Sequence, residues 1–139
     1  MGFPTADDAE AAFYRAFSFC DLDAMREIWC RDTDVTCIHP LSAPLTGFDA
    51  IIRSWEQIFR NMGPTRILSE QLHRSNWQEA ALHVVKEHFE VQGGGTAPVI
   101  ATNAYRLTAD GWRMVLHHGS PSQRPSNGTP PTPSRRTTH

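Results

Sequence analysis

The sequence predicts an α+β domain in which a curved antiparallel sheet forms a cone wrapped around N-terminal helices. Helical periodicity is confined to residues 5–62, whereas residues 66–119 read as consecutive strands joined by short turns. Helices followed by a strand meander are typical of an α+β arrangement. Because 139 residues suffice for one core but not for two, we expect a single cone domain over residues 1–120.

Residues 121–139 differ in kind from the rest of the chain. They hold five prolines and three arginines but no acid and no Leu, Ile, Val, Phe, Trp or Tyr. Such a Pro/Ser/Thr-rich segment buries too little apolar surface to offset its ordering entropy, so we expect a disordered tail. The body then carries a net charge of −5, which disfavours nucleic acid and anionic membranes as partners.

The compartment is predicted from cysteine usage and from the N-terminus. The three cysteines are odd in number and form no C-x-x-C pair, which disfavours a disulfide framework or a zinc site. No signal-peptide pattern opens the sequence, and no apolar run approaches a membrane span. We therefore expect a cytoplasmic protein with reduced thiols and no cofactor.

Three helices are expected before the meander. Thr5 caps a first helix whose apolar positions run from Ala9 to Cys20, and Asp21 caps a shorter second helix. The third helix, over residues 48–62, ends at Gly63. Its wide apolar face is expected to cover one face of the sheet.

Five strands are expected, over residues 35–39, 66–74, 80–91, 98–108 and 112–119, with tight turns at 92–95 and 109–111. Strands of this length twist and curl. A curled sheet that wraps over a helix leaves a cone with an open mouth.

The alternation of side chains along each strand predicts which of them face the cone interior. His39 shares a face with Cys37, and Glu87 shares the more apolar face of its strand with His83 and Val85. By the same reasoning Asn103 and Tyr105 point inward. In the last strand, Met114 and His118 fall on one face, which leaves His117 on the other.

The predicted interior resembles a small-ligand site, in which a few polar groups converge in an apolar cavity. Glu87 and the histidines His39 and His118 would serve as general acid and base, because a desolvated carboxyl group has a raised pKa. Asn103 or a neutral histidine would stabilise an oxyanion, with Tyr105 nearby. The apolar walls would come from Trp29, Trp55, Phe59 and Met114.

Two segments carry a family resemblance. Residues 29–55, with Val35-Thr36-Cys37-Ile38-His39-Pro40 and Leu45-Thr46-Gly47, and the closing strand at 111–121 resemble the SnoaL-like branch of the nuclear transport factor 2-like superfamily. The resemblance covers residues 6–121. It implies a cone with a pocket and a homodimer built on the outer sheet face.

The resemblance also implies a range of activities, namely isomerases, cyclases, dehydratases and non-catalytic association domains. The isomerases and cyclases generally use a pocket Asp as base, but no Asp occurs between Asp49 and Asp110. The sequence therefore leaves two functions open. The first is an acid–base enzyme that acts on a small apolar compound, and the second is a dimeric association module whose pocket is filled by side chains. An outer patch of Leu82, Val84, Ile100 and Val115 would favour a dimer.

Two further alternatives concern the same side chains. Glu87 could pair across the sheet with Arg106 or Arg113 instead of serving a ligand. A metal site would require His39, Glu87 and His118 to converge as two histidines and a carboxylate. The sequence favours neither a metal nor a cofactor.

Overall fold

The helices lie in the first half of the chain, as expected. The computed structural model describes residues 2–91, 94 and 97–122. Its helices are α1 (Ala6–Phe19), α2 (Leu22–Ile28) and α3 (Phe48–Met62). The strands are β1 (Thr36–Ile38), β2 (Leu45–Thr46), β3 (Arg66–Asn76), β4 (Ala80–Glu90), β5 (Val99–Thr108) and β6 (Gly111–Pro121).

The helix ends follow the local sequence. The Thr5 hydroxyl accepts from the Asp8 amide at 3.0 Å, and the Asp21 carboxylate accepts from the Ala24 amide at the same distance. These caps satisfy backbone donors that have no partner within the helix. Gly63 ends α3 with a φ of 69°, a conformation that costs a glycine little. The two predicted N-terminal caps, Thr5 and Asp21, are confirmed.

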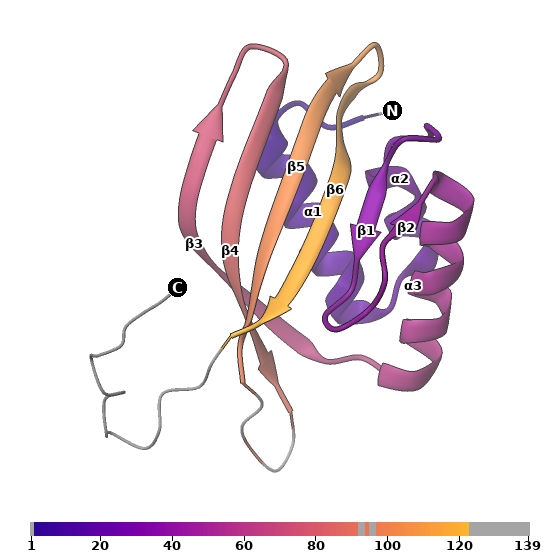
Figure 1. Cartoon of the computed structure of the whole chain (residues 1–139), viewed down its shortest axis with the longest axis vertical. Helices are drawn as coiled ribbons and strands as arrows, with labels where there is room; N and C mark the ends of the chain where they lie inside the picture. The colour runs from indigo at the N-terminus through magenta and orange to yellow at the C-terminus, as the bar shows by residue number, and fades with distance from the viewer. Residues whose placement is uncertain (1, 92–93, 95–96, 123–139) are drawn as a thin grey trace.

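The sheet has six strands in the order β2-β1-β6-β5-β4-β3. Strands β3 to β6 form the predicted antiparallel meander, visible in Figure 1. The sheet is nevertheless mixed, because β1 pairs in parallel with β6. Strand β2, a two-residue partner of β1, is not among the five strands that the sequence predicts. Residues 92–93 of the predicted turn between β4 and β5 lie outside the described part of the chain, as do 95–96.

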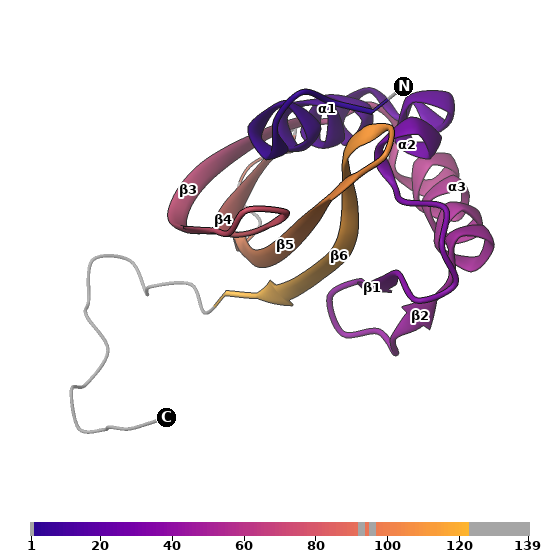
Figure 2. The same ribbon diagram turned by 90° about the horizontal axis from the view of Figure 1, so that it is seen from above.

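The long strands curl around α1 rather than around α3. Figure 2 shows α1 lying across the hollow of the sheet, with α3 beside β1 and β2 at one end. Trp55 is one of the residues by which α3 contacts this end of the sheet, and its ring packs against those of His39 and His117. The expectation that residues 48–62 cover the sheet therefore holds only at this end.

A β-bulge in β6 changes which of its side chains point inward. Tyr105 lies opposite Met114, but the preceding Ala104 lies opposite Leu116, so Val115 is an extra residue without a partner. An extra residue inverts the alternation beyond it. Met114 and His117 are consequently both buried, whereas His118 is exposed.

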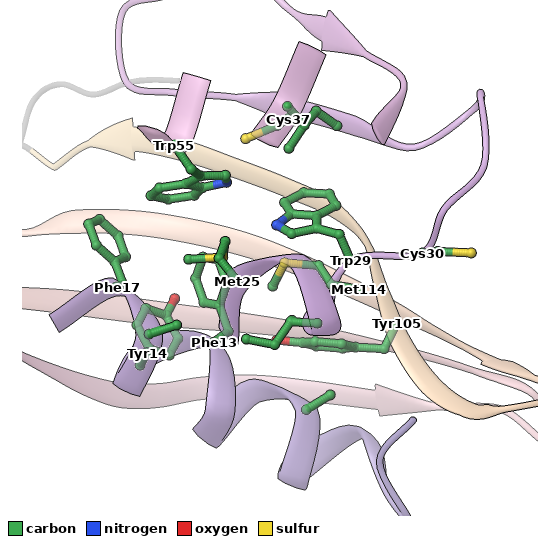
Figure 3. Packing of buried hydrophobic residues seen from close by; sticks show 14 of the residues in the cluster. Phe13, Tyr14, Phe17, Met25, Trp29, Cys30, Cys37, Trp55, Tyr105 and Met114 are labelled. Carbon is green, nitrogen blue, oxygen red and sulfur yellow. The ribbon is translucent and has the colours of Figure 1, made fainter. Parts of the chain in front are cut away.

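The core fills the space between the helices and the concave side of the sheet. Figure 3 shows Trp29 and Trp55 packed among Phe13, Phe17 and Met25. Cys37 is fully buried in this core, and all three cysteines are free. Within the described residues, no helix is both long and apolar enough to cross a membrane. Of the predicted tail, which was expected to begin at residue 121, Pro121 ends β6, and residues 123–139 lie outside the described residues.

Candidate functional site

The cone opens into a pocket of about 360 Å³ between α1, α3 and the ends of β1, β4 and β6. Its apolar wall includes Phe17, Trp55 and Phe89, and its polar groups include Glu87 and His117. This volume lies above the roughly 300 Å³ at which small-ligand sites begin. Among the described residues that line the pocket, none is a lysine or an arginine.

Glu87 is the central acid of the pocket and is only 2% exposed. The Tyr14 hydroxyl donates to its Oε2 atom at 2.6 Å. Burial raises the pKa of Glu87 to about 7, although the Tyr14 hydrogen bond acts in the opposite direction. A carboxyl group with that pKa can both take up and release a proton near neutral pH.

His117 lies beside Glu87, with its Nε2 atom 4.0 Å from Glu87 Oε2. Its other ring nitrogen, Nδ1, is 2.6 Å from Asn103 Oδ1. Burial lowers the pKa of His117 to about 3, and the neighbouring His39 and His118 act in the same direction. The imidazole is therefore neutral at physiological pH.

His39 also lines the pocket and is half-buried. Its Nε2 atom is 2.9 Å from the Ser54 hydroxyl, which itself donates to the Ile51 carbonyl at 2.6 Å. Because that hydroxyl proton is committed, the Ser54 oxygen accepts from His39 Nε2. Burial also lowers the pKa of His39, so this ring too carries no charge at neutral pH.

A second buried acid, Glu10, lies behind the pocket wall and is 4% exposed. Its Oε2 atom accepts from the Tyr105 hydroxyl at 2.7 Å and from Asn103 Nδ2 at 3.2 Å. Its Oε1 atom accepts from Gln71 Nε2 and lies 3.1 Å from His83 Nδ1. Asn103 Nδ2 also donates to the Tyr14 hydroxyl at 2.9 Å. Because Tyr14 donates in turn to Glu87, this hydrogen bond links Glu10 to the acid of the pocket.

The inward orientation predicted for β4 and β5 is confirmed. Glu87, Asn103 and Tyr105 are all buried, and Tyr105 contacts Glu10 rather than the pocket. Among the predicted wall residues, only Trp55 lines the pocket. The others are buried in the surrounding core, namely Trp29, Phe59 and Met114.

The orientation predicted for His118 is wrong. Its side chain lies on the outer face of the sheet, and His117 occupies the interior instead. The bulge at Val115 causes this exchange. Side chains alternate between the two faces of a strand, and an inserted residue reverses that alternation for every residue that follows it. Val115 packs against the core, so the predicted outer patch is reduced to Leu82, Val84 and Ile100.

The structure also decides between the alternatives for Glu87. Arg106 pairs with Asp32 at 2.7 Å, and Arg113 donates to the Glu27 carbonyl, so neither arginine pairs with Glu87. The set of His39, Glu87 and His118 does not converge, because His118 points away from the pocket. Within the described residues, no group of three metal-ligating side chains comes together.

Sequence reasoning missed two residues of the site, Glu10 and Tyr14. They lie four residues apart on α1 and therefore share a face of the helix. That face adjoins the apolar positions Ala9, Phe13 and Phe17. A polar pair directly beside an apolar stripe is a signal that could have identified them.

A larger cavity of about 490 Å³ lies between α1 and the start of β3. Its lining includes the exposed side chains of Phe19 and Leu68 and the buried Tyr14. Neither Glu87 nor His117 reaches it. The smaller pocket is the candidate site, because it is lined by both Glu87 and His117, two buried groups with shifted pKa values.

Comparisons with solved structures agree with this architecture. A candidate association domain of calcium/calmodulin-dependent protein kinase type II from Thiobacillus denitrificans is 42% identical, with a TM-score of 0.85 over 88% of this chain and 99% of that one. A candidate dehydratase of the NTF2-like family from Streptomyces avermitilis is 29% identical, with a TM-score of 0.76 over 85% of this chain and 94% of that one.

Comparisons at the level of sequence give the family. The F-box protein SKIP8 of Arabidopsis thaliana is 29% identical in an alignment of 108 positions that covers 71% of this chain. The match spans only 42% of that longer protein. The family model of the SnoaL-like domain matches residues 7–123. The chain therefore belongs to the SnoaL-like domain family, as its sequence resemblance indicated.

Proposed function

We propose that the pocket binds a small, uncharged and mostly apolar organic compound and catalyses its isomerisation or dehydration by acid–base chemistry. The observation that carries the proposal is a buried carboxyl group, Glu87, with a pKa of about 7 in a pocket with an apolar wall. This fold family includes isomerases and dehydratases. The chemistry uses side chains alone.

The charge of the pocket supports an uncharged ligand. His39 and His117 are neutral at physiological pH because burial lowers their pKa values. With no lysine or arginine among the described lining residues, the pocket has no cation to compensate a buried carboxylate or phosphate. Placing an uncompensated anion beside Glu87 would cost several kcal/mol.

Glu87 would act as the proton carrier of the reaction. As a carboxylate it would remove a proton from carbon beside a carbonyl group, and as an acid it would return that proton to another carbon or to a leaving hydroxyl. Tyr14 stabilises the ionised form through its hydrogen bond to Oε2. Returning the proton restores Glu87, so neither an oxidant nor a further reactant is needed.

The first experiment is a binding screen of uncharged aromatic and alicyclic ketones and alcohols by ligand-observed NMR. Ile58 lines the pocket from α3, whereas its neighbour Gln57 is exposed outside it. We expect Ile58→Trp to obstruct the pocket and abolish binding, and the matched control Gln57→Trp to retain it. Loss of turnover in Glu87→Gln with binding kept would support catalysis. Binding that survives Ile58→Trp would refute this site.

A second candidate function is supported by one comparison. The Thiobacillus denitrificans protein, at 42% identity, is described as a candidate association domain. On this chain Leu82, Val84 and Ile100 lie partly exposed on the outer face of β4 and β5. We propose that a homodimer forms through this face, either in addition to the pocket chemistry or as the main function of the domain.

A further inference from the structure

We infer that Glu10 is a positioning residue that sets the donor and acceptor pattern of the pocket. It does so by orienting the Asn103 amide, which in turn fixes the tautomer of His117. The pocket then presents a bare nitrogen to its ligand and selects compounds that carry a hydroxyl donor. The ligand class rests on the proposed function, whereas the tautomer does not.

The first step is the orientation of the Asn103 side chain. Its amide nitrogen lies 3.2 Å from Glu10 Oε2 and 2.9 Å from the Tyr14 hydroxyl oxygen. The Tyr14 proton is directed to Glu87, so the Tyr14 oxygen acts as an acceptor toward Asn103. Reversing the amide would place its oxygen against the Glu10 carboxylate in a buried site, a repulsive contact that proteins avoid.

The second step is the tautomer of His117. With its nitrogen turned toward Glu10 and Tyr14, Asn103 presents its oxygen to His117 Nδ1 at 2.6 Å. An oxygen acceptor requires a proton on Nδ1, and a neutral imidazole has only one such proton. His117 Nε2 therefore carries a lone pair. At 4.0 Å from Glu87 Oε2, Nε2 is too far away for a direct hydrogen bond to that carboxyl group.

The third step is the consequence for a ligand. His117 and Glu87 both line the pocket, and the lone pair on Nε2 accepts hydrogen bonds but cannot donate them. An alcohol, phenol or enol can satisfy Nε2, whereas an ether or an isolated ketone leaves it unpaired. Leaving a buried polar group unpaired is expected to weaken binding by about tenfold to one-hundredfold, which is equivalent to roughly 1.4–2.8 kcal/mol.

The tautomer can be measured directly in the ligand-free protein. Two-bond ¹H–¹⁵N correlation spectra distinguish a protonated ring nitrogen from a bare one, and His117→Asn assigns the signal. We expect the proton of wild-type His117 on Nδ1. A proton on Nε2 would overturn the inference without any variant of Glu10.

Glu10→Met tests whether Glu10 is the cause, because methionine keeps the length of the side chain but removes both acceptor oxygens. In this variant we expect the Nε2-protonated tautomer of His117 to become about as populated as the Nδ1-protonated tautomer. Tyr105→Phe is the matched control, since it removes one donor to Glu10 but leaves the Glu10 contact with Asn103. An unchanged tautomer in a folded Glu10→Met protein would refute the role of Glu10.

The ligand class is tested with a matched pair of probes, 2-naphthol and 2-methoxynaphthalene, by titration calorimetry. We expect the wild type to bind the naphthol at least tenfold more tightly and Glu10→Met to lose that preference. Equal affinities would refute the predicted ligand class while leaving a small-molecule pocket in place. Binding of neither probe would count against the proposed function itself, and the tautomer would still decide the role of Glu10.

Discussion

The Tyr14 hydroxyl lies 2.6 Å from Glu87 Oε2, although 73 residues separate them in the sequence. One comes from α1 and the other from β4, and both are almost completely buried. A charge-assisted hydrogen bond of this length stabilises a carboxylate. It therefore moderates the effect of burial on the pKa of Glu87, and it links the N-terminal helix to the chemistry of the pocket.

Tyr14→Phe is expected to raise the pKa of Glu87 above its value of about 7. The lost hydrogen bond favours the ionised carboxylate, so its removal shifts the equilibrium toward the acid by about one pKa unit. A ¹³C NMR titration of the Glu87 carboxyl group measures the shift. Tyr105→Phe, which removes a hydroxyl bound to Glu10, should leave that titration nearly unchanged. A lower pKa in Tyr14→Phe would contradict the assigned role of the bond.

The raised pKa of Glu87 predicts how stability depends on pH. Between its unfolded value of 4.5 and its folded value of about 7, the folded protein holds a proton that the unfolded chain has released. The free energy of unfolding therefore falls as pH rises through this window, by about 3 kcal/mol from this group. The Glu87→Gln variant does not show this fall, because glutamine does not titrate.

Urea denaturation at pH 5 and pH 8 measures the effect. We expect Glu87→Gln to gain stability relative to the wild type at the higher pH. Glu90→Gln is a suitable control, because Glu90 lies on the same strand but is exposed. The same pH dependence in wild type and Glu87→Gln would show that Glu87 titrates normally.

The lowered pKa of His117 predicts that, on the acid side, the free energy of unfolding depends on pH in the opposite direction. Its pKa falls from 6.5 in the unfolded chain to about 3 in the folded protein, so only the unfolded chain takes up a proton between these values. The free energy of unfolding falls as pH drops through this window, by about 5 kcal/mol from this group. Between pH 4.5 and 6.5 this slope opposes that of Glu87.

His117→Asn should reduce the acid sensitivity, because asparagine keeps a donor for Asn103 Oδ1 but does not titrate. The neighbouring His118→Asn is the matched control, since His118 is exposed. Acid denaturation followed by circular dichroism compares the two. A larger effect in His118→Asn would mean that the assignment of inner and outer histidines is reversed.

The proposed homodimer makes a separate prediction. Val84→Glu places a charge at the centre of the outer face of β4, where an apolar interface would have to desolvate it. We expect a dimeric wild type and a monomeric variant by light scattering after size-exclusion chromatography. Gln57→Glu, on the exposed side of α3, should leave the mass unchanged. A wild type that is already monomeric would refute the second candidate function.

Local sequence was sufficient for the elements and for part of the site. Thr5 and Asp21 predicted two helix starts because capping depends on a few neighbouring atoms. Simple alternation also placed Glu87 and Asn103 inside, because β4 and β5 pair without a bulge between them. The family resemblance agreed with the matched domain over residues 7–123.

What the sequence alone determined is therefore the fold class, the helix boundaries and an inward carboxyl group on β4. Only the tertiary structure decided that His117 rather than His118 enters the pocket, because the bulge at Val115 depends on the pairing of β6 with β5. The partnership of Glu10 and Tyr14 with Asn103 and Glu87 is also tertiary. Periodicity reports which face of an element is buried, but the atoms that meet there depend on how α1 lies across the sheet.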